Sequence, residues 1–103
     1  MKNSNHIVQR LQAWYASQCD QNWEHSFGVQ IGTLDNPGWV VTIDLVGTAL
    51  FNVSFEPGER GDSENGQDWL RLKSDGKVFT GAGGVENLEE ILEAFLSWAE
   101  SGP

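Results

Sequence analysis

Two alternating runs on either side of a turn constrain the fold of this chain more than any other feature. Residues 27–34 and 39–45 alternate between larger apolar residues and polar or small ones, which is typical of half-buried β-strands. The residues between them, Asp35-Asn36-Pro37-Gly38, combine an aspartate that can bond its own turn, a proline with fixed φ and a glycine free to adopt positive φ. The sequence therefore predicts a β-hairpin and an antiparallel sheet.

Three more strands are predicted after the hairpin. Residues 50–56 alternate in the same way, and residues 69–73 and 77–80 flank Asp75-Gly76, a pair typical of tight hairpin turns. Residues 57–67, with the sequence PGERGDSENGQ, contain no large apolar side chain and predict a long mobile loop. Successive strands are therefore expected to pair as an antiparallel meander.

The chain begins and ends with an amphipathic helical pattern. Near its start, five apolar residues at helical spacing predict a helix from about Asn5 to Gln18: Ile7, Val8, Leu11, Trp14 and Tyr15. A second helix is predicted to end near Glu100, and its start is marked by Asn87 and Glu90, which have the spacing of a capping box. The GAGG run at 81–84 is interpreted as a flexible entry to this helix rather than a phosphate-binding loop, since no Lys-Ser/Thr pair follows.

This order of helix, strands and helix predicts a single α+β domain over residues 1–103. It is an antiparallel four- to five-stranded meander sheet with the N-terminal and the C-terminal helix packed on one face. A chain of 103 residues buries enough surface for one modest core. The other sheet face is expected to be partly open and to carry Trp69 with a set of polar residues: Gln30, Thr42, Asp44, Asn52 and Ser54.

Charge and composition narrow the possible partners. The net charge is −9, from 15 Asp and Glu against 6 Lys and Arg, which disfavours nucleic acid as a partner and favours a basic protein. Acidity that serves only solubility is the alternative. No apolar run approaches the ~20 residues that span a bilayer, and the N-terminus has no signal-peptide core, so neither a membrane partner nor export is expected. One cysteine, Cys19, agrees with a cytoplasmic location.

The segment from Cys19 to Trp39 gathers the side chains that packing alone explains least. Glu24 and His25, with Asp20 nearby, could perform general acid-base chemistry, but a network of structural hydrogen bonds explains the same residues. A zinc site usually needs four ligands in paired spacing, whereas this chain has one Cys and two His. The sequence therefore predicts no catalytic residue, no metal site and no cofactor.

Tryptophan is unusually frequent, with five in 103 residues. Trp14 and Trp98 lie on the predicted helices and are expected to pack in the core. Trp23, Trp39 and Trp69 stand beside loops and strand ends, where large rings often act as binding anchors. Burial in the core is an equally good explanation for each of these three rings.

Five stretches of the sequence form a recognisable pattern: LQAWYASQCDQNWEHSFGVQIGTLDNPGW, IDLVGT, DWLRLK, FTGAGG and NLEEILEAFLSW. Through them the chain resembles the immunity protein 53 family of bacterial polymorphic toxin systems over nearly its whole length. The most specific parts are WY-x-x-QCD-x-x-WEH-x-[FY]G and TLDNPGW. One departure is Gln21-Asn22, where the family pattern leads us to expect Gly-Asp. The motif residues implied to have a structural or functional role are Trp14, Tyr15, Cys19, Asp20, Trp23, Glu24, His25, Asp35, Asn36, Pro37, Gly38 and Trp39.

What the resemblance implies is a cytoplasmic antidote that binds a cognate toxin and blocks it without doing chemistry. The acidic balance favours a toxin with a basic groove, such as a nuclease, whose groove the antidote would occlude. The residues predicted to contact the toxin are Asp44, Glu56, Glu59, Asp62, Glu64, Asp68 and Trp69. The alternatives are a small enzyme that uses Glu24 and His25, and a non-catalytic subunit of a larger assembly.

Overall fold

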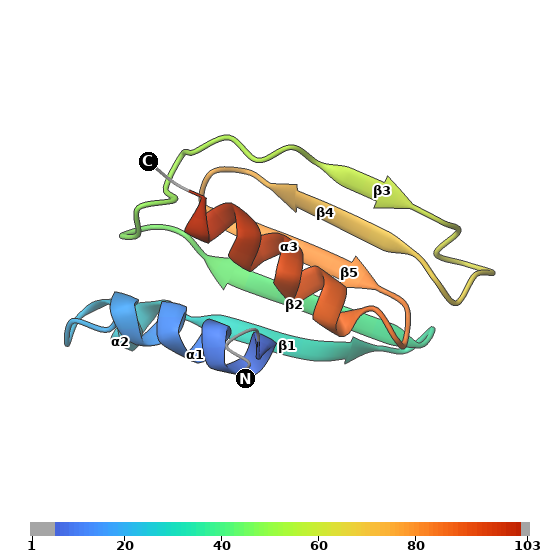
Figure 1. The fold of residues 1–103 in the computed structure, drawn as a ribbon, viewed down its shortest axis with the longest axis horizontal. Helices are drawn as coiled ribbons and strands as arrows, with labels where there is room; N and C mark the ends of the chain where they lie inside the picture. Colours follow the sequence, from blue (N-terminus) through green and yellow to red (C-terminus); the bar gives the residue numbers. More distant parts are fainter. Residues whose placement is uncertain (1–5, 102–103) are drawn as a thin grey trace.

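A computed structural model describes residues 6–101 and shows one sheet with helices on one of its faces (Figure 1). In chain order the elements are α1 (Ile7–Gln18), α2 (Trp23–Ser26), β1 (Val29–Leu34), β2 (Gly38–Asp44), β3 (Gly58–Arg60), β4 (Leu70–Ser74), β5 (Val78–Gly83) and α3 (Leu88–Glu100). The predicted helix start at Asn5 lies outside the described residues. The predicted α+β class, with an antiparallel sheet between two terminal helices, is confirmed.

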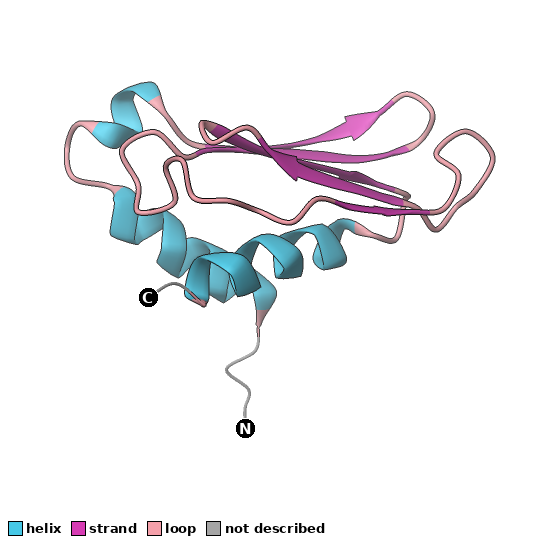
Figure 2. Cartoon of the chain, turned by 90° about the horizontal axis from the view of Figure 1, so that it is seen from above, coloured by secondary structure: helices cyan, strands magenta, loops and turns pink. Residues whose placement is uncertain are grey.

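The sheet has five strands in the order β1-β2-β5-β4-β3, and every neighbouring pair is antiparallel. It is therefore a β1–β2 hairpin joined to a β3–β4–β5 meander through the pairing of β2 with β5. The expectation of one continuous meander is wrong at this point, because the chain crosses from β2 to the far edge before it returns. Seen along the sheet, α1 and α3 lie on the same side of it (Figure 2).

The β1–β2 hairpin forms where the sequence predicts it, with Leu34 opposite Gly38. Gly38 is buried and does not adopt positive φ, so the expected turn role of this glycine is wrong. A Cβ at this position would collide with the carbonyl oxygen of Gly83 and lie 3.3 Å from Trp69 Cζ2. Gly38 is needed because two backbones and an indole ring approach each other closely here.

The strand predicted at residues 50–56 is absent, and β3 lies instead within the predicted loop at 57–67. Residues 48–52 form turns, in which the N–H of Val53 donates to the carbonyl of Leu50. Leu50 is buried and Phe55 packs against Phe79, whereas Phe51 and Val53 are more than 40 % exposed. The alternation in the sequence therefore does not correspond to alternate burial: the chain reverses at these residues, and only Leu50 and Phe55 reach the core.

The GAGG run is mostly strand rather than a flexible entry, since β5 continues to Gly83. Gly81 and Gly83 are buried beneath α3. A Cβ at Gly81 would lie 2.5 Å from Ile91 Cγ2, and one at Gly83 would lie 2.9 Å from the Cβ of Asn87. These two glycines allow the helix to pack directly on the backbone of β5.

The core lies between the sheet and the helices. Its fully buried side chains are Phe79, Phe95, Ile43, Leu45, Ile91, Leu96 and Val41. Three tryptophans also tie loops to this layer, because their indole N–H groups donate to backbone carbonyls. The pairs are Trp23 with Val46, Trp39 with Val85, and Trp98 with Ser54.

Candidate functional site

The carboxyl ends of β1, β3 and β5 meet at one end of the sheet, since these three strands run in the same direction. The loops that follow them, residues 35–37, 61–68 and 84–87, lie together at the right-hand end of Figure 1. Two adjoining hollows of about 370 and 220 Å³ form between these loops and share Gln67 and Val85 in their walls. This is the candidate site.

Carboxylates dominate this end of the molecule. We define the acidic end by six exposed acids in and beside these loops: Asp35, Asp62, Glu64, Asp68, Glu86 and Glu90. Two basic residues lie beside them: Arg60, at the end of β3, and Arg71, whose guanidinium donates to the carbonyls of Arg60 and Gly61. The topology thus gathers acids from three separate segments of the chain at this end.

Close backbone contacts fold the 61–68 loop on itself and hold it against the 84–87 loop. Gly61 has a φ of 79°, and a Cβ there would collide with the carbonyl oxygen of Asp68. A Cβ at Gly84 would collide with the carbonyl oxygen of Gln67. The Asp62 carboxylate accepts hydrogen bonds from the N–H of Glu64 at 2.9 Å and from the side chain of Asn65, and these bonds lower the pKa of Asp62.

Asn87 joins the 61–68 loop, the 84–87 loop and the start of α3. Its side chain is almost fully buried, and its Oδ1 accepts hydrogen bonds from the N–H of Trp69 at 3.3 Å and of Gly84 at 3.0 Å. Its Nδ2 donates to the carboxylates of Asp68 and Glu90. The predicted capping box is therefore wrong in detail: α3 does begin after Asn87, but the Asn87 side chain makes no cap bond to the helix.

Arg60 neutralises part of the acidic end. Its guanidinium donates to Asp68 and to both carboxylate oxygens of Glu90. These bonds hold the pKa of Asp68 and that of Glu90 below their ordinary values and raise the pKa of Arg60. Within the acidic end, Asp35, Asp62, Glu64 and Glu86 form no salt bridge with another described residue, although the charge of Arg71 also helps to lower the pKa of Asp62.

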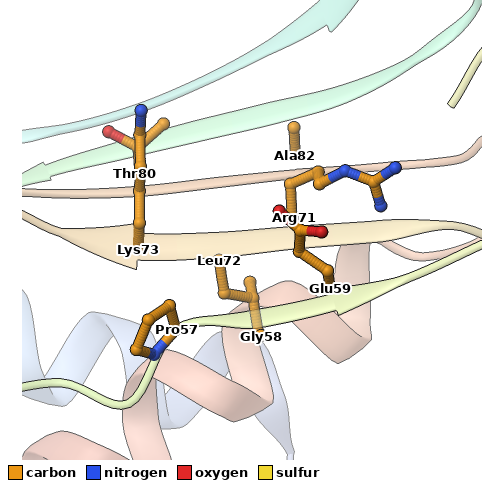
Figure 3. A pocket seen from close by; sticks show the side chains of 8 residues that line it. All are labelled: Pro57, Gly58, Glu59, Arg71, Leu72, Lys73, Thr80 and Ala82. Carbon is orange, nitrogen blue, oxygen red and sulfur yellow. The ribbon is translucent and has the colours of Figure 1, made fainter.

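Three of the predicted contact acids lie elsewhere. Asp44, at the opposite end of β2, is half-buried and accepts a hydrogen bond from the N–H of Gly28 at 2.9 Å. Glu56 precedes β3, and Glu59 lies within β3 on the open sheet face opposite Arg71. Figure 3 shows Glu59 at a hollow on this face that is also lined by Arg71, Lys73 and Thr80.

Trp69 is not an exposed anchor. Only 5 % of the residue is accessible, and the Arg71 guanidinium carbon lies 5.9 Å from the ring centroid. The prediction that this ring lines an open surface is therefore wrong. The same prediction is also wrong for Asn52 and Ser54, which lie outside the sheet, whereas Gln30 and Thr42 are neighbours on that face.

The motif segment at 19–26 forms a small capped helix rather than the predicted loop. One Asp20 oxygen accepts the N–H groups of Asn22 and Trp23, while the Glu24 carboxylate accepts those of Asp20 at 2.9 Å and Gln21 at 2.7 Å. Hydrogen bonds from the N–H groups of Trp23 and Asn22 lower the pKa of Asp20. The pKa of Glu24 is lowered by hydrogen bonds from its own N–H and from the N–H groups of Asp20 and Gln21. These carboxylates therefore serve the local fold.

The remaining motif residues surround this small helix or the hairpin turn. The ring of Tyr15 packs edge-on against Trp23, and that of Trp14 packs edge-on against Phe95. Cys19 is exposed, and its thiol donates a hydrogen bond to the carbonyl of Tyr15. His25 is exposed, as are Asn36 and Pro37 in the turn. No group of three or more His, Cys, Asp or Glu side chains within residues 6–101 is arranged to hold a metal ion.

Sequence reasoning missed part of the acidic end. Glu86, Glu90 and Arg60 were not predicted as site residues, and Asp35 was assigned to the turn motif alone. Asp35 follows β1 and Glu86 follows β5, and these two strands run in the same direction, so both residues lie at the same end of the sheet. The sequence reveals this shared location only once the pairing of β2 with β5 is known.

Comparison with known proteins identifies the family. The family model for immunity protein 53 matches residues 8–100. The chain belongs to the immunity protein 53 family. Membership in the immunity protein 53 family implies a role as the immunity protein of a toxin system, with a toxin as partner. Searches of curated proteins and of solved structures gave no significant match. None of the helices within residues 6–101 is long and apolar enough to cross a membrane.

Proposed function

We propose that this immunity protein 53 member binds its cognate toxin through the acidic end and occludes a basic groove on that toxin. The observation that carries the proposal is the convergence of six exposed carboxylates from three loops and the start of α3, which outnumber the two nearby cations, Arg60 and Arg71. Carboxylates spaced along such a surface can take the places of substrate phosphates in a nuclease groove. A nuclease-type toxin is therefore the favoured partner.

The net charge of −9 also supports this mechanism, because it acts on a basic partner at long range. A strongly acidic protein attracts a basic partner before contact, so that association is fast and sensitive to salt. We place this encounter in the cytoplasm, where a nuclease would meet its substrate. Inhibition by occlusion needs no turnover, and Glu24, the acid of the alternative enzyme hypothesis, is engaged by backbone N–H groups.

The experiment compares two double variants that each remove two negative charges. Glu64→Gln/Glu86→Gln changes unpaired acids of the acidic end, whereas Glu56→Gln/Glu59→Gln changes exposed acids away from it. The association rate of each variant with the cognate toxin, which the neighbouring gene encodes, is measured by stopped flow at a series of salt concentrations. We expect the first pair to slow association by about tenfold at low salt and to flatten its salt dependence, and the second pair to behave like the wild type.

Two results would contradict this proposal. Binding of the wild type that is indifferent to salt would remove the electrostatic mechanism, since screening shortens the Debye length from about 10 Å at 0.1 M to about 3 Å at 1 M. An equal effect of both double variants would show that overall charge matters and that the acidic end is not the contact surface.

A further inference from the structure

The outer edge of β1 is an unprotected sheet edge. β1 pairs only with β2, and its six residues, VQIGTL, include no charge and no proline. The opposite edge is protected: β3 has three residues, follows Pro57 and contains Glu59 and Arg60. There the Arg71 guanidinium also donates to the carbonyls of Arg60 and Gly61. Proteins usually block exposed edges by short strands, charges or proline, and β1 has none of these.

The backbone of β1 has a defined set of free groups. In an antiparallel ladder, residues alternate between pointing their N–H and C=O groups toward the partner strand and away from it. The N–H of Asp44 donates to the carbonyl of Gly28, which sets the alternation for the whole strand. Val29, Ile31 and Thr33 therefore point their backbone N–H and C=O groups outward, away from β2.

Exposed apolar side chains accompany this edge. Ile31 is 43 % exposed on the helix side of the sheet, opposite Val41 in the register. Val8 and Tyr15 are also exposed, and they lie on the flank of α1 that faces away from α3. The other flank of α1 is identified by Arg10, which bonds to α3. Figure 1 shows that α1 crosses one part of β1 and leaves the arrow end of the strand uncovered.

We propose that the β1 edge is a homodimer interface, in which β1 pairs antiparallel with β1 of a second copy about a two-fold axis beside Ile31. Ile31 then faces the partner's Ile31, and Val29 faces the partner's Thr33. In this register the outward-pointing residues of each strand meet those of the other, so each can donate and accept a hydrogen bond. The contact uses the same patch on both copies, as a closed dimer requires, and joins two five-stranded sheets into one.

Charge selects a second copy rather than a basic toxin as the occupant. Two chains of net charge −9 can approach each other closely only where acids are absent, and β1 is such a place. The nearest acids are Asp44, whose carboxylate accepts from the N–H of Gly28, and Asp35. Gly28 and Asp35 lie three and four residues from Ile31, so each acid would be about 20 Å or more from its counterpart, well beyond a Debye length of about 8 Å. A basic toxin finds no carboxylate on this edge. The dimer goes beyond the proposed function and leaves both acidic ends free.

The first test measures the molar mass of the purified protein by sedimentation equilibrium over a concentration series. We expect a monomer–dimer equilibrium in the wild type. Ile31→Lys places like charges opposite each other on the axis and should weaken the dimer by at least about tenfold. Phe51→Lys is the matched control, because Phe51 is also 43 % exposed but lies beside the β4–β5 turn, where the N–H of Asn52 donates to the carbonyl of Gly76, and it should dimerise like the wild type.

The second test checks the register by disulfide formation in a Cys19→Ser background, which removes the exposed native thiol. Ile31→Cys places two thiols on residues with Cα atoms about 5.5 Å apart, within the range of a disulfide. Thr33→Cys places them about 14 Å apart. We expect the first variant to cross-link under mild oxidation and the second to stay monomeric on a non-reducing gel.

Several outcomes would overturn the proposal. They are a wild type that stays monomeric at every soluble concentration, a dimer that Ile31→Lys leaves intact, and equal cross-linking of the two cysteine variants. A monomeric wild type whose toxin binding is lost in Ile31→Lys would assign the edge to the toxin instead. Toxin binding through the acidic end is scored separately, by the glutamate variants, so either proposal can fail alone.

Discussion

Gln21 has a backbone conformation that favours glycine. Its φ is 77°, and the other positive-φ residue with a side chain among residues 6–101 is Asn52, at 59°. Asparagine tolerates this region better than glutamine because its short polar side chain can bond locally. Glycine is also the residue expected at position 21 from the family pattern. The turn between α1 and α2 therefore gives a physical reason for the glycine expected at this position and identifies Gln21 as a strained residue.

We predict that Gln21→Gly stabilises the protein. Relief of the left-handed conformation should exceed the entropy that glycine adds to the unfolded chain, for a net gain of about 1 kcal/mol. Asn52→Gly serves as the control and should change stability by less than about 0.5 kcal/mol, because asparagine already suits positive φ. Urea denaturation followed by tryptophan fluorescence measures both. A loss of stability in Gln21→Gly would show that the glutamine side chain contributes more than the strain costs.

At the scale of elements, the spacing between α3 and the sheet depends on β5 having no side chains at two positions. Gly81 and Gly83 lie directly under the helix, near Ile91 and Asn87. The helix is thereby close enough for Phe95 to reach Phe79, with ring centroids 5.1 Å apart. The nearest neighbour of Gly81 is Ile91, which is itself fully buried. A side chain at position 81 therefore could not be accommodated by moving Ile91 alone.

We predict that Gly81→Ala destabilises the protein by about 1–3 kcal/mol, the usual cost of overpacking. Gly32→Ala is the control, because a Cβ there would lie 3.8 Å from Val40 Cγ1, an ordinary contact, and should leave stability nearly unchanged. Thermal unfolding by circular dichroism compares the two variants. If Gly81→Ala were as stable as the wild type, α3 would not rest on β5 as closely as described.

At the scale of the whole molecule, two arginines hold distant parts of the chain to α3. Arg10 of α1 bonds to Glu93 and Glu100, and Arg60 of β3 bonds to Glu90 and to Asp68. The pKa of Glu93 is lowered by Arg10, and those of Asp68 and Glu90 by Arg60. A carboxyl group with a lowered folded-state pKa contributes stability above its unfolded pKa and loses that contribution as the pH falls through its folded pKa.

We predict that the melting temperature falls as the pH is lowered through and below the ordinary carboxyl values of 3.8 and 4.5. Arg10→Gln/Arg60→Gln should reduce this slope, because the three carboxyls then return toward ordinary pKa values. Lys73→Gln is the control, since Lys73 forms no salt bridge within the described residues, and should keep the wild-type slope. An unchanged slope in the double arginine variant would contradict this account.

Local sequence signals predicted what local interactions decide. The hairpin at Asp35–Gly38, the turn at Asp75-Gly76 and the extent of α3 follow from turn chemistry and helical period, and the structure has each of them. Residues 50–56 misled because an alternating pattern does not exclude a chain reversal, in which only Leu50 and Phe55 reach the core. Trp69 misled because its ring packs against Gly38 of β2, a contact between strands that no local pattern encodes.

The candidate site was only partly predictable for a similar reason. Asp62, Glu64 and Asp68 share one loop, so their common location is readable from the sequence. Their association with Asp35 and Glu86 depends on the β2–β5 pairing, which joins residues about 40 positions apart through contacts that no local pattern encodes. The strand order is therefore the missing information.

The three loops of the acidic end also bear on how such a protein can evolve. Their carboxylates belong to separate turns, and none of the fully buried core side chains lies in them. A substitution in one turn therefore leaves the other turns and the core as they were. On the proposed mode of binding, a lineage could follow a drifting toxin one turn at a time without unsettling the fold.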